Sequence, residues 1–131
     1  MRVSRQYLWL LLLGSFALSA RQEFSLKLKD HLFSPARLTV PAGEKIKIRL
    51  INQDDTPEEF ESFSLNREKV VLGQSQAVIY LGPLQPGEYP FFGDFHPDSA
   101  KGVLIALADA QWRAYQQQQT ENNETETPHV D

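Results

Sequence analysis

The chain has 131 residues, with 13 Lys and Arg against 17 Asp and Glu, a net charge of −4 at pH 7 and no cysteine. This length predicts a single domain, and a hydrophobic content of 41% is that of a globular protein. The acidic balance argues against nucleic acid as a partner, and the lack of cysteine excludes disulfide bridges, zinc–thiolate sites and a cysteine nucleophile.

The first 20 residues have the pattern of a signal peptide. Arg2 and Arg5 precede an apolar run over residues 7–18, which is too short to span a bilayer comfortably. Small residues follow, and three cleavage points fit the sequence, after Ala17, Ser19 or Ala20. We expect residues 1–20 to direct export to the periplasm and to be removed, with an uncleaved membrane anchor as the alternative.

Residues 21–108 are predicted to form an all-β domain. Apolar and polar residues alternate over 24–29 and, most clearly, over 45–50, which is typical of half-buried strands. Further strands are expected at 37–40, 60–65, 76–81, 89–95 and 103–108. Turn residues separate these segments about every ten residues, which indicates a sandwich or barrel of seven or eight strands.

A Pro-Gly turn at Pro86 and Gly87 runs into Tyr89. This arrangement is typical of the tyrosine corner of a Greek-key sandwich, although an ordinary turn followed by a strand aromatic gives the same pattern.

The C-terminal segment, residues 109–131, has a different composition. Asp109 is expected to cap a short helix in which Trp112 and Tyr115 lie one turn apart. Four glutamines and a polar, acidic end follow, and we expect this tail to be disordered.

Five acidic residues and no basic one lie within eight positions: Asp54, Asp55, Glu58, Glu59 and Glu61. If the strand predicted there turns Phe63 and Leu65 toward the core, Glu59 and Glu61 share that face. A carboxylate on the core side needs a metal ion or an arginine beside it. Two other interpretations stay open, a solvated acidic loop and salt bridges to Arg67 and Lys69.

A second group of candidate ligands lies on the loop predicted between the last two strands. Asp94 and Asp98 flank His96, and this combination suits Fe(II), Mn(II) or Cu(II). A single surface histidine usually has no such role. His31, at a strand end, is expected to be exposed to solvent, and His129 lies in the tail.

These segments together resemble the cupredoxin superfamily over residues 23–108. The resemblance rests on Phe33-Ser34-Pro35, Leu38-Thr39-Val40-Pro41-Ala42-Gly43, Asn52, Pro86-Gly87-Glu88-Tyr89-Pro90-Phe91-Phe92, His96 and Lys101-Gly102-Val103. It implies a Greek-key cupredoxin-like β-sandwich, followed here by the short C-terminal helix and the disordered acidic tail.

The resemblance does not extend to a blue-copper centre, which needs a Cys thiolate. Gly93 stands where such a protein has its Cys, while the histidine three residues later is kept as His96. The methionine region holds Ala100 and Lys101, and the first histidine ligand, expected near residues 59–63, is missing.

Three longer segments look like periplasmic cupredoxin-like proteins of bacterial iron-uptake systems of the EfeO and P19 types. They are Thr56–Ser62, Asn66–Val70 and Phe91–His96. The resemblance implies binding of copper or iron, a part in ferrous-iron transfer or oxidation, and two partners, a periplasmic P19-type iron protein and an inner-membrane iron permease. Phe63 is a departure, because this group often has a histidine there.

The leading hypothesis is therefore an exported metal-binding protein of periplasmic iron uptake. Its predicted ligands for a copper or iron ion are Glu59, Glu61, Asp94 and His96. Enzymatic turnover is left open, because any redox step needs a metal with open coordination positions. The alternative is a structural adaptor that binds a periplasmic partner without metal. A hydrolase is disfavoured, since no nucleophile and base are paired in the sequence.

Overall fold

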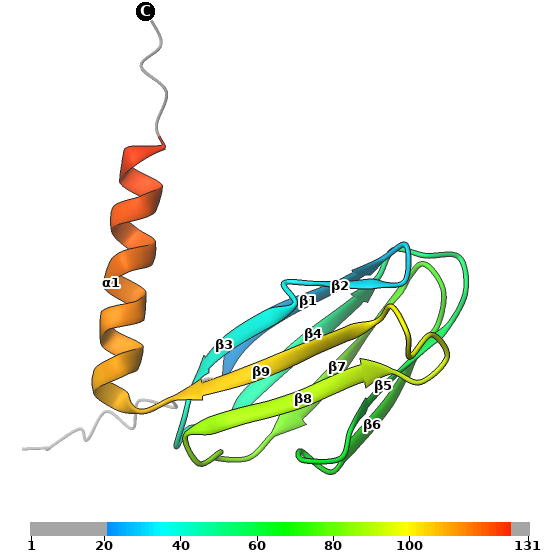
Figure 1. Cartoon of the computed structure of the whole chain (residues 1–131), viewed down its shortest axis with the longest axis horizontal. Coiled ribbons are helices and arrows are strands. Elements are labelled where there is room, and N and C mark those ends of the chain that lie inside the picture. Colours follow the sequence, from blue (N-terminus) through cyan, green and yellow to red (C-terminus); the bar gives the residue numbers. More distant parts are fainter. Residues whose placement is uncertain (1–20, 127–131) are drawn as a thin grey trace, which may run out of the picture.

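Two β-sheets pack face to face and enclose the apolar side chains that alternate along their strands (Figure 1). The computed structural model describes residues 21–126, so the predicted signal peptide and the last five residues lie outside the described part. Nine strands lie within that part: β1 (Gln22–Lys29), β2 (Leu32–Ser34), β3 (Arg37–Pro41), β4 (Ile46–Asn52), β5 (Glu58–Ser62), β6 (Arg67–Val71), β7 (Ser75–Leu81), β8 (Gly87–Gly93) and β9 (Lys101–Leu107).

The strand order shows the crossed connections of a Greek-key sandwich. The first sheet has the order β2-β1-β4-β7 and the second the order β3-β9-β8-β5-β6. The pairs β1–β4 and β3–β9 are parallel, and the other pairs are antiparallel. The predicted all-β sandwich is thus confirmed, with two short strands, β2 and β6, that the sequence pattern had not indicated.

Period-two burial follows the predicted alternation most closely in β4, where Ile46, Ile48 and Leu50 are fully buried. Three rings from three strands meet in the core below the loop end: Phe91 lies 5.2 Å from Phe33 and 5.1 Å from Phe60, centroid to centroid. This aromatic contact ties the two sheets together beneath the candidate site described below.

The predicted tyrosine corner is present. The hydroxyl of Tyr89, near the start of β8, donates a hydrogen bond of 2.7 Å to the carbonyl oxygen of Gln85. The bond reaches back four residues and fixes the connection between β7 and β8, as it does in Greek-key sandwiches.

The C-terminal helix α1 (Asp109–Thr125) is longer than the short helix predicted there, and residues 116–125 are helical rather than disordered. Glutamine is a good helix former, so the four glutamines extend the helix. Asp109 is the first helical residue and not the cap: Ala108 takes the cap position without a side-chain bond, and Asp109 instead pairs with Arg113 at 2.8 Å.

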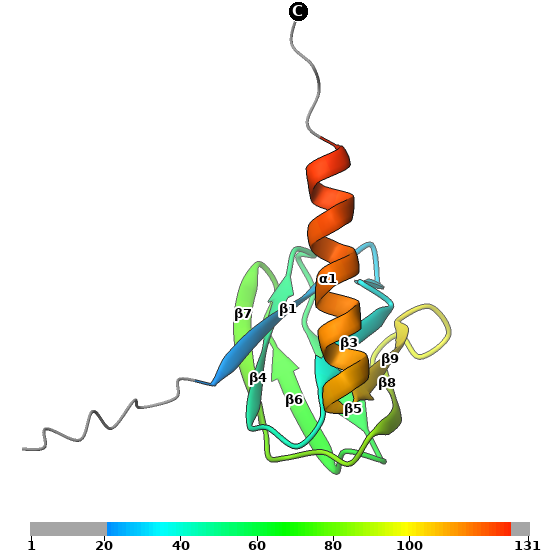
Figure 2. The ribbon, with the colours of Figure 1, turned by 90° about the vertical axis from the view of Figure 1, so that its left-hand side faces the viewer.

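Helix α1 buries none of its residues and extends away from the sandwich (Figure 2). Its first turns contact the sandwich through Trp112, whose ring lies edge-on to that of Phe24 at 6.1 Å and stacks on Tyr115 at 5.6 Å. Within residues 21–126, no helix has the length and apolar character needed to cross a lipid bilayer.

Candidate metal centre

Three side chains with metal-binding atoms meet at the end of the sandwich opposite α1. His31 lies in the turn between β1 and β2, Glu58 begins β5, and His96 lies in the loop between β8 and β9. Figure 1 shows this turn and this loop at the same end of the molecule. One nitrogen or oxygen atom from each residue lies within 4.8 Å of those of the other two.

Glu58 is the buried centre of this group, with 1% of the residue exposed. Its Oε1 accepts hydrogen bonds from the backbone N–H of Glu59 at 3.0 Å and of Phe95 at 2.9 Å. Its Oε2 lies 2.7 Å from Nδ1 of His96. An ionised carboxylate only accepts hydrogen bonds, so Nδ1 of His96 carries the proton and Nε2 keeps the lone pair that a metal ion needs.

His31 is held by a second carboxylate. Asp54 accepts the backbone N–H of Asp30 at 2.7 Å and of His31 at 3.0 Å, and it lies 3.5 Å from Nδ1 of His31. The imidazole of His31 stacks on that of His96, with centroids 3.5 Å apart and planes 12° from parallel. The expectation that His31 is simply solvent-exposed is wrong: it is half-buried and belongs to the cluster.

The loop after β4 places Asp54 beside that turn. The buried amide of Asn52 donates to the carbonyl oxygen of Thr56 at 2.8 Å and accepts the N–H of Asp54 at 3.0 Å. Burial alone would raise the pKa of Asp54, but the N–H donors of His31 and Asp30 outweigh it and lower that pKa below its usual value. Asp54 is therefore a charged anchor for the turn that carries His31.

Gly93 provides the space that Glu58 occupies. A Cβ placed on Gly93 would lie 2.6 Å from Cδ of Glu58 and 2.8 Å from Cβ of Ala100. The loop that follows folds onto itself, with the N–H of Gly93 bonded to the carbonyl of Ala100 and that of Ala100 bonded to the carbonyl of His96. Glycine at this position lets the carboxylate and the histidine loop approach each other closely.

The structure contradicts the predicted orientation of Glu59 and Glu61. In β5 the buried positions are Glu58, Phe60 and Ser62, so Glu59 and Glu61 point to the outer face of the second sheet. The prediction counted from Phe63, but β5 ends at Ser62 and Phe63 lies in the turn, 79% exposed. Alternation does not continue through a turn, and a shift of one residue exchanges the two faces.

The four predicted ligands are therefore not brought together. His96 lies with His31 and Glu58, whereas Glu59 and Glu61 have carboxylate oxygens close to that of Glu68, all within 4.8 Å of one another. Asp94 is exposed; its backbone N–H bonds to the carbonyl of Glu59 at 2.8 Å, and its carboxylate lies close enough to Glu61 to raise the pKa of that acid.

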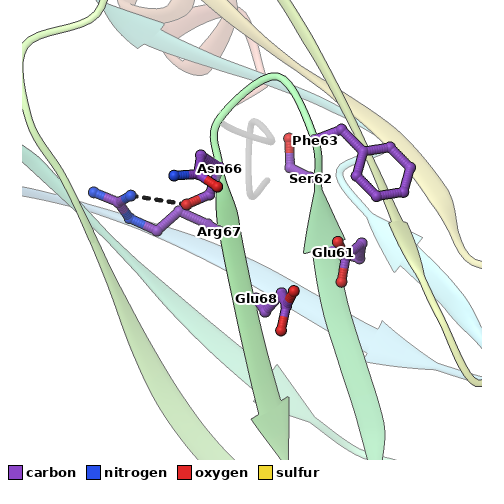
Figure 3. Close-up of a pocket in the computed structure, with 6 residues that line it drawn as sticks. All are labelled: Glu61, Ser62, Phe63, Asn66, Arg67 and Glu68. Atoms are coloured by element: carbon purple, nitrogen blue, oxygen red, sulfur yellow. Dashed lines mark hydrogen bonds between the residues drawn. The ribbon is translucent and has the colours of Figure 1, made fainter.

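The outer-face acids are not paired with the basic residues suggested by the sequence. In the part of the chain that the structure covers, neither Arg67 nor Lys69 forms a salt bridge with them; the guanidinium of Arg67 donates to the carbonyl of Tyr80 instead. Figure 3 shows Glu61 and Glu68 on neighbouring strands, with Arg67 on the far side of β6.

We expect Glu61→Gln to stabilise the protein at neutral pH but not in acid. Partial burial, and then the charges of Glu68, Glu59 and Asp94, raise the pKa of Glu61 above its usual value of 4.5. An acid whose pKa is raised by folding costs stability when ionised, and the cost is absent below the unfolded pKa. The melting temperature should rise by about 1–4 °C at neutral pH and be unchanged near about pH 4.

Thermal unfolding followed by circular dichroism at both pH values measures this difference. Glu88→Gln is the matched control, because Glu88 belongs to the same sheet but lies 3.6 Å from Arg37. An equal gain in both variants would contradict the role of the neighbouring acids.

Comparisons with known proteins agree with this architecture. The family model for a cupredoxin-like domain matches residues 5–106. An uncharacterized protein of Rickettsia prowazekii (strain Madrid E) is 48% identical over 83 residues, which are 63% of this chain and 66% of that protein, just under two thirds of its length.

Two solved structures share the fold. A copper-binding protein studied by NMR in the apo form has a TM-score of 0.59 at 15% identity, covering 68% of this chain and 90% of its own. Auracyanin A, a "blue" copper protein of Chloroflexus aurantiacus, has a TM-score of 0.58 at 13% identity, covering 67% of this chain and all of its own. At such identities the likeness concerns the fold alone.

Proposed function

This chain belongs to the cupredoxin-like domain family, and from that membership and the cluster at its loop end we propose that it is an exported protein that binds copper or iron. The observation that carries the proposal is the convergence of His31, Glu58 and His96, whose candidate ligand atoms lie within 4.8 Å of one another. The copper-binding proteins that share its fold support the choice of metal.

The donor set fits a metal held by nitrogen and oxygen and does not fit a thiolate-bound copper. The sequence contains no cysteine, and the space beside Gly93 is filled by the carboxylate of Glu58. Two imidazole nitrogens, with the carboxylate of Glu58 beside them as a negative charge that orients His96, suit Cu(II) or Fe(II). Bound copper would supply the one-electron chemistry that the side chains lack, and iron would be the cargo.

Each residue has a distinct part in this proposal. His96 and His31 would bind the ion through Nε2. The Nδ1 atom of each ring faces a carboxylate, Glu58 for His96 and Asp54 for His31, which leaves Nε2 for the metal. Glu58 orients His96 and supplies a negative charge beside the ion. Asp54 orients His31 through its backbone and its ring.

We also propose a place for the protein in periplasmic iron uptake, beside a P19-type iron protein and an inner-membrane iron permease, with ferrous-iron transfer or oxidation as its task. The segments Thr56–Ser62, Asn66–Val70 and Phe91–His96 support this through their resemblance to such proteins. The signal-peptide pattern of residues 1–20 supports the same location.

Calorimetric titration with Cu(II) and with anaerobic Fe(II) tests the metal site. The wild type should bind one ion at the loop end, and His96→Ala and His31→Ala should each weaken binding by more than about tenfold. Nitrogen couplings in the Cu(II) paramagnetic resonance spectrum should be lost progressively in the two variants.

Glu61→Gln is the control, because it changes the outer-face acids alone. Equal affinity of the wild type and both histidine variants, with loss in Glu61→Gln, would move the site to the outer face, where Glu59 and Glu61 are the predicted ligands. No binding in any variant would leave the adaptor function as the better explanation.

A further inference from the structure

An aromatic surface lies on the outer face of the second sheet, away from the histidine cluster. Phe63 is 79% exposed, and its ring lies 5.6 Å from that of Phe92. Together with Ser64 and Pro90 these rings line a surface hollow of about 290 Å³. Figure 3 shows Phe63 projecting sideways from the turn after β5. Large aromatic rings gathered at the surface in this way are typical of interaction sites.

The acids beside this surface form no salt bridge within the part of the chain that the structure describes. Glu61 is directly opposite Glu68 in the β5–β6 register, an arrangement that costs stability in a sheet. On the first sheet, by contrast, salt bridges with Arg49 and Lys47 lower the pKa of Glu23 to about 2. Among residues 21–126, no Lys or Arg forms a salt bridge with Glu59, Glu61 or Glu68.

We propose that this face, made of Phe63, Phe92 and the acids Glu59, Glu61 and Glu68, docks a basic segment of a partner protein. Lysine or arginine side chains of the partner would pair with the acids, and an apolar side chain would enter the hollow. Charge complementarity selects this occupant, because the face carries three acids that form no salt bridge within residues 21–126. The nearby cations do not neutralise them: Arg67 donates to the carbonyl of Tyr80, and Lys101, opposite Phe92, forms no salt bridge with these acids. The rings of Phe63 and Phe92 would be buried by the partner, and buried aromatic rings contribute much of the binding energy of such interfaces.

Other occupants fit less well. A second copy of this chain would bring the same acids against each other, and its net charge is −4. Helix α1 is also acidic, with Asp109, Glu121 and Glu124 against Arg113. Since Glu58 and Glu61 point to opposite faces of β5, a partner bound here leaves the metal cluster accessible.

The test uses the isotope-labelled exported protein and a short peptide with lysine at alternate positions and phenylalanine or leucine between them. We expect amide shifts confined to β5, the turn of residues 63–66, β6 and the last residues of β8. Affinity should fall by more than about tenfold in Phe63→Ser and in the double variant Glu61→Gln/Glu68→Gln. A peptide with glutamate in place of lysine, and one with serine in place of the apolar residues, should not bind.

Tyr80→Ser and Glu88→Gln are matched controls, since Tyr80 is 57% exposed elsewhere on the surface and Glu88 is paired with Arg37. Both should bind as the wild type does. Binding that is absent, spread over both sheets or equally weakened by the controls would overturn the proposal. So would outer-face shifts caused by Cu(II) or Fe(II) alone. His96→Ala should leave peptide binding unchanged, so failure of the metal site is distinguishable from failure of this surface.

Discussion

Replacing Glu58 with alanine should lower the free energy of unfolding by about 3 kcal/mol and weaken metal binding as strongly as the loss of His96. The carboxylate is 1% exposed and accepts from three donors, the N–H groups of Glu59 and Phe95 and Nδ1 of His96. Alanine leaves all three without this acceptor and opens a space beside Gly93. A buried donor that loses its acceptor costs more than the bond itself is worth, because it was already removed from water.

Urea unfolding followed by circular dichroism measures the loss. Glu59→Ala is the matched control at the next position, where the side chain lies on the outer face; its effect should stay within about 0.5 kcal/mol. If Glu58→Ala is as stable as the control, the carboxylate does not hold the loop. A loss of metal binding without a loss of stability would make Glu58 a ligand rather than the residue that positions His96.

Local patterns were sufficient to predict much of the fold. Strict alternation in β4 and the Pro-Gly-x-Tyr turn before β8 each depend on residues close together in the sequence, and both predictions are confirmed. The ends of elements were harder to predict. The end of β5 at Ser62 is set by a tight turn that includes Asn66 at a φ of +51°, and nothing in the apolar pattern indicates where extension stops.

The candidate site was only partly predictable, because its members meet through pairing between distant strands. His96 was found from its neighbours and the family resemblance. His31 was missed because β1 and β4 pair in parallel, which brings the turn after β1 beside the loop after β4. The sequence signal is a pair of polar segments, Asp30-His31 directly after one alternating strand and Asp54-Asp55 one residue beyond another. If β1 and β4 are taken to pair in parallel, these two polar segments lie at the same end of the sheet, which places His31 near Asp54.

The choice of the wrong glutamates has a simple physical origin. Phe60 and Phe63 are both large aromatic residues at a spacing of three, so they cannot share one face of a strand. Taking Phe60 as the core residue places Glu58 inside, as in the structure, and Phe63 at the surface. Two phenylalanines have the same size, so size cannot show which of them is buried. Phe60 is buried because Phe33 and Phe91, from other strands, pack against it.

Gly93→Ala should cost about 2 kcal/mol, because the added methyl would lie 2.6 Å from Cδ of Glu58 and 2.8 Å from Cβ of Ala100. Gly82→Ala is the control: it has no atom within 4 Å of its added Cβ, so its effect should be below about 0.5 kcal/mol. Chemical denaturation of both variants measures the difference.

A double-mutant cycle then shows which contact opposes a side chain at position 93. In the Glu58→Ala background the carboxylate is gone while Ala100 still crowds the methyl, so Gly93→Ala should cost less there by about 1 kcal/mol. Strict additivity would mean that the carboxylate of Glu58 does not oppose a side chain at position 93. A measured coupling would show that Glu58 and a side chain at position 93 compete for one space. The carboxylate that orients His96 would then be incompatible with a cysteine thiolate at that position, which explains why this chain combines a cupredoxin-like sandwich with a nitrogen and oxygen donor set.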